Sequence, residues 1–147
     1  VIRALLNFKP RQASTDIEGA LDFLGKVTKK RSVVFLVSDF QAEGFEKPMR
    51  VIGKRHDLVA VTVVDPREVR LPDVGLVELE DAETGDIILV DTGSAAIRKR
   101  YERLGREQSD RFRELFSSMG VDQIEVMTDR DYVPNLVRFF RTRERRY

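Results

Sequence analysis

The sequence predicts an α/β fold: a three-layer, doubly wound, mostly parallel sheet with an inserted β-hairpin. Short, almost purely apolar runs, as expected for strands buried on both faces, alternate with longer segments in which apolar residues recur every three or four positions. This alternation is typical of parallel sheets covered by helices on both faces. The length of 147 residues suits a single domain, residues 1–147, with one hydrophobic core.

Three apolar runs are the predicted parallel strands, at residues 32–38, 58–64 and 121–127. Helical patterns flank them at about residues 15–30, 45–56, 95–118 and 131–142, and residues 1–7 read as the end of an earlier helix. Ser14 or Thr15 is expected to cap the first of these helices and Asp131 the last. Two further strand-like runs surround Gly85, which predicts the inserted hairpin at about residues 75–91.

The composition indicates a globular domain and excludes several classes of function. Apolar residues make up 41% and charged residues 35% of the chain, but the formal charge is only +1, so we expect no nucleic acid partner. Cysteine is absent, which removes disulfides and thiolate chemistry and fits a reducing, cytoplasmic location. The longest uninterrupted apolar run, Val33 to Val37, is far shorter than the roughly 20 residues of a membrane span.

The first residue, Val1, lies inside an apparent helical pattern. We therefore expect the chain to be a piece of a longer protein, in which segments missing here would hold any membrane anchor.

Each predicted parallel strand is followed by an aspartate, namely Asp39, Asp65 and Asp129. Ligands of such sheets bind beyond the carboxyl ends of the strands, so all three are candidate site residues. Aspartate is also a common turn and cap residue. We interpret Asp65 and Asp129 as structural, and both interpretations stay open for Asp39.

Asp39 is of particular interest because Thr15 stands at the start of the helix that leads into the same strand. A hydroxyl at a helix N-terminus beside a carboxylate at a strand end forms an environment of oxygen ligands only, as magnesium prefers. The alternative is that Thr15 is a simple helix cap.

The segments around these two residues resemble a von Willebrand factor type A domain. The resemblance rests on residues 14–21 (STDIEGAL) and 33–40 (VVFLVSDF). In that family, a threonine from one loop and an aspartate after the next strand belong to a metal-ion-dependent adhesion site, which implies metal roles for Thr15 and Asp39. Residues 55–57 (RHD), 64–68 (VDPRE), 71–75 (LPDVG) and 128–132 (TDRDY) extend the resemblance. Together they resemble a bacterial family of unknown function that is associated with MoxR-type AAA+ ATPases and has an A-domain-like C-terminal half.

One departure from the family pattern limits the predicted site. A complete adhesion site also needs an Asp-x-Ser-x-Ser segment, which this sequence does not contain. The resemblance places that segment, with the central strand of the sheet, upstream of Val1. We therefore expect a half-site that holds magnesium in the intact protein but binds no cofactor here. We also expect an open edge beside residues 33–37, through which the fragment forms a homodimer.

The remaining candidates favour structural roles. His56 stands at a predicted helix end, and no serine or cysteine forms a recognisable nucleophile turn, so we expect no enzymatic activity. The arginines of the last helix, including Arg138, Arg141 and Arg143, suit a solvated helix end.

The leading hypothesis is a non-enzymatic protein-interaction module that works with an AAA+ ATPase, as the resemblance implies. The alternatives are a metal-dependent phosphoryl hydrolase that uses Asp39 with Asp65 or Asp129, and a metal-free scaffold.

Overall fold

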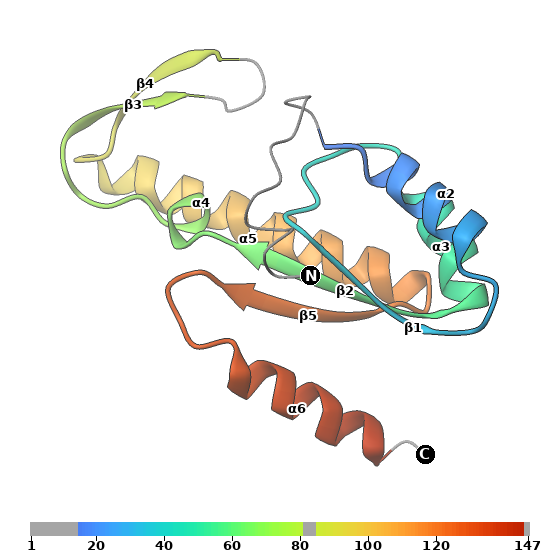
Figure 1. Cartoon of the computed structure of the whole chain (residues 1–147). Helices are drawn as coiled ribbons and strands as arrows, with labels where there is room; N and C mark the ends of the chain where they lie inside the picture. The colour runs from blue at the N-terminus through green and yellow to red at the C-terminus, as the bar shows by residue number, and fades with distance from the viewer. Residues whose placement is uncertain (1–14, 81–84, 146–147) are drawn as a thin grey trace, which may run out of the picture.

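The computed structural model describes residues 15–80 and 85–145 and has an α/β architecture (Figure 1). Three parallel strands, β1 (Val33–Ser38), β2 (Asp57–Val64) and β5 (Asp122–Met127), form a sheet in the order β1-β2-β5. Val34 pairs with Leu58 across the first strand pair. The parallel sheet predicted from the apolar runs is therefore confirmed, and it puts all three strand ends at one edge.

Helices cover both faces of the sheet, as expected for a doubly wound fold. On one face lie α2 (Ile17–Val27), α3 (Glu46–Arg55) and α5 (Ala95–Ser118), and on the other lies α6 (Val133–Glu144). Successive side chains of β2 point to opposite faces of the sheet, which explains how this strand contacts both groups of helices. Leu58 and Ala60 join the core beneath the first group of helices, whereas Val59 and Val61 pack with residues of α6.

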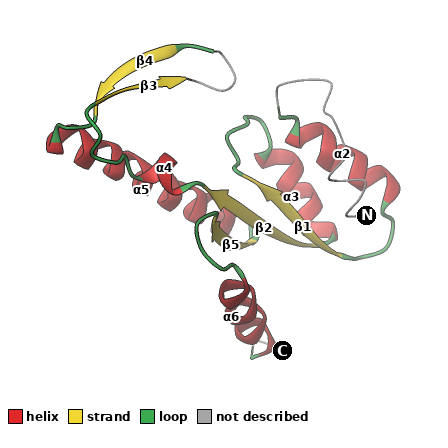
Figure 2. Cartoon of the chain, turned by 60° about the vertical axis from the view of Figure 1, so that its left-hand side comes forward, coloured by secondary structure: helices red, strands yellow, loops and turns green. Residues whose placement is uncertain are grey.

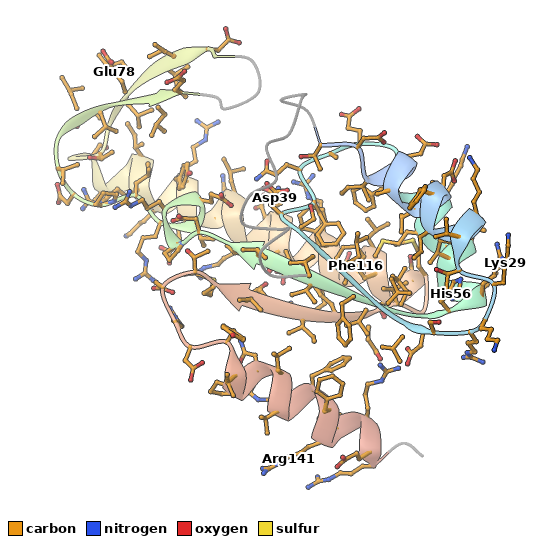
Figure 3. All side chains as sticks on the ribbon, in the orientation of Figure 1. Lys29, Asp39, His56, Glu78, Phe116 and Arg141 are labelled. Carbon is orange, nitrogen blue, oxygen red and sulfur yellow. The ribbon has the colours of Figure 1, made fainter. Side chains whose placement is uncertain are left out.

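The two faces differ in the size of their cores. The larger core is centred on Phe116 of α5, which is fully buried and lies 4.9 Å from the ring of Phe40 (Figure 3). The smaller core joins Val59, Val61 and Ile124 to one side of α6. Arg143 fixes the end of α6, since its guanidinium contacts carboxylates at the starts of β2 and β5.

The predicted hairpin forms a separate two-stranded antiparallel sheet of β3 (Leu76–Glu80) and β4 (Ile87–Asp91), which projects away from the parallel sheet (Figure 2). Its base is fastened by buried Thr92, whose hydroxyl donates to the Gly75 carbonyl at 2.6 Å and accepts from the Val74 amide at 3.2 Å. The short helix α4 (Pro66–Val69) lies between β2 and the hairpin.

The prediction that residues 32–38 are buried on both faces was wrong. Burial alternates along β1, and Val33, Phe35 and Val37 are 56%, 43% and 61% exposed. The reason is position in the sheet, because β1 pairs only with β2 among the described strands, and α6 packs mainly over β2 and β5.

The helix caps also differ from the predictions. Asp16, not Thr15, caps α2, and its carboxylate accepts a hydrogen bond from the Gly19 amide at 2.7 Å. The last helix begins at Val133, and Asp131 accepts from the Val133 amide at 3.0 Å without being its N-cap residue. The other predicted cap, Ser14, and the helix predicted at residues 1–7 lie outside the described residues.

Candidate functional site

The three aspartates predicted as site residues follow the ends of β1, β2 and β5, at the carboxyl edge of the sheet. The structure separates their roles. Asp65 caps α4 by accepting a hydrogen bond from the Arg67 amide at 2.8 Å, which fits the structural interpretation. Asp129 is 3.3 Å from the guanidinium of its neighbour Arg130. Of the three, only Asp39 lines a pocket at this edge.

The loop that carries Asp39 is held by a buried aromatic ring. Phe40, directly after it, adopts a left-handed backbone conformation with a φ of 59°, which is uncommon for a residue other than glycine. Its side chain is 2% exposed and packs against Phe45, Phe112 and Phe116. This packing stabilises the unusual conformation and keeps the Asp39 carboxylate at the surface, where it accepts hydrogen bonds from Ser38 and Gln41.

Thr15, the second predicted metal ligand, lies at the start of α2 and is exposed. This helix start is next to the loop after β1, since Ile17 and Phe40 belong to the same core cluster. A Cβ atom added to Gly44 would lie 3.5 Å from a carboxylate oxygen of Glu18. Thr15 and Asp39 therefore belong to neighbouring segments at one end of the sheet. That they share an ion stays a prediction.

A complete metal site is not present in the described part of the chain. No three His, Asp or Glu side chains among residues 15–80 and 85–145 come together in a way that could hold a metal ion. Thr15 and Asp39 supply oxygen ligands, which suit magnesium, but they provide only part of the coordination that this ion requires.

The pocket at the carboxyl edge has a volume of about 490 Å³ and lies between α5 and the ends of β2 and β5. Its walls are largely apolar, and its acidic lining residues are Asp39, Glu68 and Glu125. Gly105 allows α4 to approach α5 here, because a Cβ atom at this position would lie only 3.1 Å from the Cα of Val69. A volume of this size is within the range of small-ligand sites.

Burial and the nearby acidic groups raise the pKa values of two pocket residues. The pKa of the Glu68 carboxyl is raised above its ordinary value, first by burial and then by the negative charges of Asp39 and Asp65. Burial is also the main cause of the raised pKa of Tyr101, with Glu68 and Asp65 adding to it. The Tyr101 hydroxyl donates to the Arg67 carbonyl at 3.1 Å. The carboxyl edge of the sheet is therefore acidic.

The sheet surface beneath the pocket is polar. Gln123 donates from its side-chain amide to the Thr62 hydroxyl at 2.9 Å, and Ser109 of α5 donates to the Glu125 carboxylate at 2.7 Å. These residues were not predicted as a site from the sequence. A usable signal was present, because Gln123 and Glu125 alternate with apolar residues in a strand that was expected to be buried on both faces.

His56 lies at the opposite end of the sheet from Asp39 (Figure 3). It follows α3 and is 2% exposed, and neither ring nitrogen forms a hydrogen bond. At the same end, Arg143 of the basic last helix contacts Asp57 and Asp122 and lies over the ring of Phe139. Both residues belong to the packing of the fold and not to the pocket.

The fold and the pocket define a class of protein: a parallel α/β domain with an acidic pocket at the carboxyl edge of its sheet. The chain belongs to the family described as "Protein of unknown function DUF58", which matches residues 1–111. The predicted membership in a bacterial family of unknown function is thereby confirmed.

The relatives of this chain include mycobacterial proteins. It is 33% identical over 131 residues to "Uncharacterized protein MAV169" of Mycobacterium avium, which covers 88% of this chain and 77% of that protein. It is 32% identical over 137 residues to "Uncharacterized protein Rv1480" of Mycobacterium tuberculosis and to "Uncharacterized protein Mb1516" of Mycobacterium bovis. The chain spans only 43% of the length of each of these two. No solved structure matches, and no described helix is both long and apolar enough to cross a membrane.

Proposed function

We propose that this chain is a non-enzymatic, A-domain-like interaction module that binds a protein partner at the carboxyl edge of its sheet. The observation that carries the proposal is the pocket at this edge, with exposed Asp39 on its lining. Grooves beyond the carboxyl ends of parallel strands are the usual binding places of such folds. The anchored conformation of Phe40 supports this role, because it presents Asp39 in a fixed position.

The chemistry of the pocket supports binding over catalysis. Its hydroxyl groups, on Thr62, Ser109 and Tyr101, are hydrogen bonded to Gln123, to Glu125 and to the Arg67 carbonyl, respectively. No histidine or lysine is among the lining residues, and the one histidine of the sequence is buried at the other end of the sheet. Among the lining residues, only carboxylates could serve as the base that a nucleophile needs at neutral pH.

The partner class follows from the family resemblance, which implies a MoxR-type AAA+ ATPase. In the intact protein, Thr15 and Asp39 would hold a magnesium ion together with the upstream Asp-x-Ser-x-Ser segment. A carboxylate of the ATPase would complete the coordination of that ion. The ion would supply a positive charge between two negatively charged surfaces.

Calorimetry with the intact protein and the purified ATPase tests this proposal. We expect binding in magnesium and its loss in EDTA or in Asp39→Ala. Asp129→Ala is the matched control, because this aspartate also follows a strand of the sheet but lies outside the pocket. The 147-residue chain should bind magnesium at least tenfold more weakly than the intact protein.

Two results would overturn the proposal. Binding that is unaffected by EDTA and by Asp39→Ala would exclude the metal-bridged contact. Magnesium-dependent hydrolysis of p-nitrophenyl phosphate, abolished in Asp39→Ala and retained in Asp129→Ala, would favour the phosphoryl hydrolase instead.

A further inference from the structure

We infer that the pocket between α5 and the sheet binds a basic side chain of the partner, through an alkylguanidinium or alkylammonium group. The inference rests on the proposed function, since it names the chemistry that a protein partner would insert beside Asp39. The contact differs from a metal-bridged carboxylate in its charge and in its independence of magnesium, and it adds Glu68 and Glu125 to Asp39.

The charge of the pocket favours a cation. Asp39, Glu68 and Glu125 line it, and none of the three forms an ion pair in the part of the chain that the structure describes. The one basic lining residue, Arg106, is already paired with Glu102, whose carboxylate lies 2.5 Å from its guanidinium. The lining therefore carries an excess of negative charge, which a bound cation would neutralise.

The shape and polarity of the walls favour a cation on an apolar stem. Val69 of α4, Leu104 and Phe112 of α5, and Met127 of β5 line the pocket beside the carboxylates. Leu104 is 50% exposed, so apolar surface is available to a ligand. Lysine and arginine side chains combine an alkyl stem with a charged end and bury the stem along surfaces of this kind.

Other classes of ligand fit less well. A bare metal ion needs several converging oxygen ligands, and no such group of three acidic or histidine side chains exists among the described residues. An anion would be repelled by the three carboxylates. A neutral apolar ligand would leave the same carboxylates desolvated and without a counter-charge, which is costly.

The position of the pocket agrees with a side chain that arrives from another protein. The acids lie at the carboxyl edge, and Thr62 and Glu125 are acceptors at the sheet surface beneath α5. Guanidinium is the better match of the two cations, because its several donors can reach Glu68 and a second acceptor together.

The experiment is a ¹⁵N NMR titration of the 147-residue chain in EDTA, with N-acetyl-arginine amide as the probe. N-acetyl-citrulline amide has nearly the same shape without the charge. We expect saturable shifts at the amides of Gly105, Ser109 and Met127 with the arginine probe only, and a millimolar Kd. Glu68→Gln should weaken binding roughly tenfold, as the loss of one charge-assisted contact does.

Glu107→Gln is the matched control, because Glu107 is an exposed acid of α5 that lies outside the pocket and pairs with Arg103. Equal responses to arginine and citrulline, or equal losses in the two glutamine variants, would overturn the inference. So would tighter binding of free putrescine than of an arginine-containing peptide, since the ligand would then be a free amine.

The two proposals fail separately. The titration contains neither magnesium nor ATPase, so arginine binding without ATPase binding would overturn only the proposed function. Magnesium-dependent ATPase binding without arginine binding would overturn only the inference that the pocket binds a basic side chain.

Discussion

The space between α5 and the sheet has two halves that differ sharply. Toward the amino ends of the strands, Phe116, Leu58, Ala60 and Val121 form a buried apolar core. Toward the carboxyl ends, the same helix and the same strands enclose a pocket with Thr62 and Glu125 on the sheet surface. The strands place the polar residues Thr62 and Glu125 on the same face as the apolar core residues, without any change of fold.

This difference separates stability from function. The half near the amino ends of the strands, here called the packed half, contributes apolar burial, which is the dominant stabilising term in folding. The half that encloses the pocket, here called the hollow half, contains acidic groups that are not neutralised. This arrangement costs stability, and proteins retain such a cost where a site is needed. Substitutions in the packed half should therefore weaken the protein, whereas removal of charge in the hollow half should strengthen it.

The largest effect is expected for Phe116→Ala. Phe116 is fully buried, and its ring lies 4.9 Å from that of Phe40 and 5.9 Å from that of Phe112. Its loss should lower the free energy of unfolding by about 3 to 5 kcal/mol, measured by urea denaturation. The control, Leu104→Ala, changes a half-exposed residue on the pocket side of the same helix and should cost much less. Equal losses would show that the two halves do not differ in packing.

A stabilising effect is expected for His56→Met, after α3 and at the end of the sheet opposite the pocket. The imidazole is 2% exposed, and neither of its nitrogens has a hydrogen-bond partner. An apolar side chain of similar size should raise the free energy of unfolding by about 1 kcal/mol, because a buried polar group without a partner is costly. His56→Ala is the control and should destabilise by leaving a cavity. A loss of stability in His56→Met would indicate that the imidazole ring stabilises the fold.

A smaller, pH-dependent gain is expected for Glu68→Gln in the hollow half. Burial and the charges of Asp39 and Asp65 raise the pKa of the Glu68 carboxyl in the folded protein. The folded state therefore disfavours the ionised form, so Glu68 costs stability at neutral pH. That cost disappears as the pH falls through the raised pKa. The variant should melt slightly above the wild type at pH 7. Its free energy of unfolding should rise by no more than about 0.5 kcal/mol, because Glu68 is only partly buried and solvent screens its charge.

The melting temperatures of the two proteins should converge at a pH below the ordinary glutamate pKa, where the wild-type carboxyl is also neutral. A gain that persists unchanged in acid would show that the carboxylate charge is not its cause.

The smallest effect is expected at the outer edge of β1, the edge strand of the sheet among the described strands. Val33 and Val37 are more than half exposed, and β1 pairs only with β2 among the described strands. We expect weak two-fold association of the 147-residue chain through this edge, visible by light scattering at high concentration. Val37→Lys should abolish it, whereas Val27→Lys, at the end of α2, should not. A wild-type monomer at every concentration would contradict this prediction.

Local sequence patterns determined the elements of this fold. Residues 95–118 repeat apolar side chains at helical spacing over six turns, and the predicted helix coincides with α5. The runs at 58–64 and 121–127 agree with β2 and β5 to within one residue. Such patterns predict the elements correctly because each pattern depends on residues that are neighbours in the chain. The parallel direction of the strands follows from the helices that connect them.

Only the tertiary structure decided burial and the pocket. The apolar run of β1 does not reveal that the strand lies at an edge among the described strands, so its burial was predicted wrongly. Asp39 was identified from the sequence because it directly follows a strand, but Glu68, Tyr101 and Glu125 were not. They come from α4, α5 and β5, which are distant along the chain. Their proximity is created by the packing of α5 over the strand ends, and a local pattern contains no information about it.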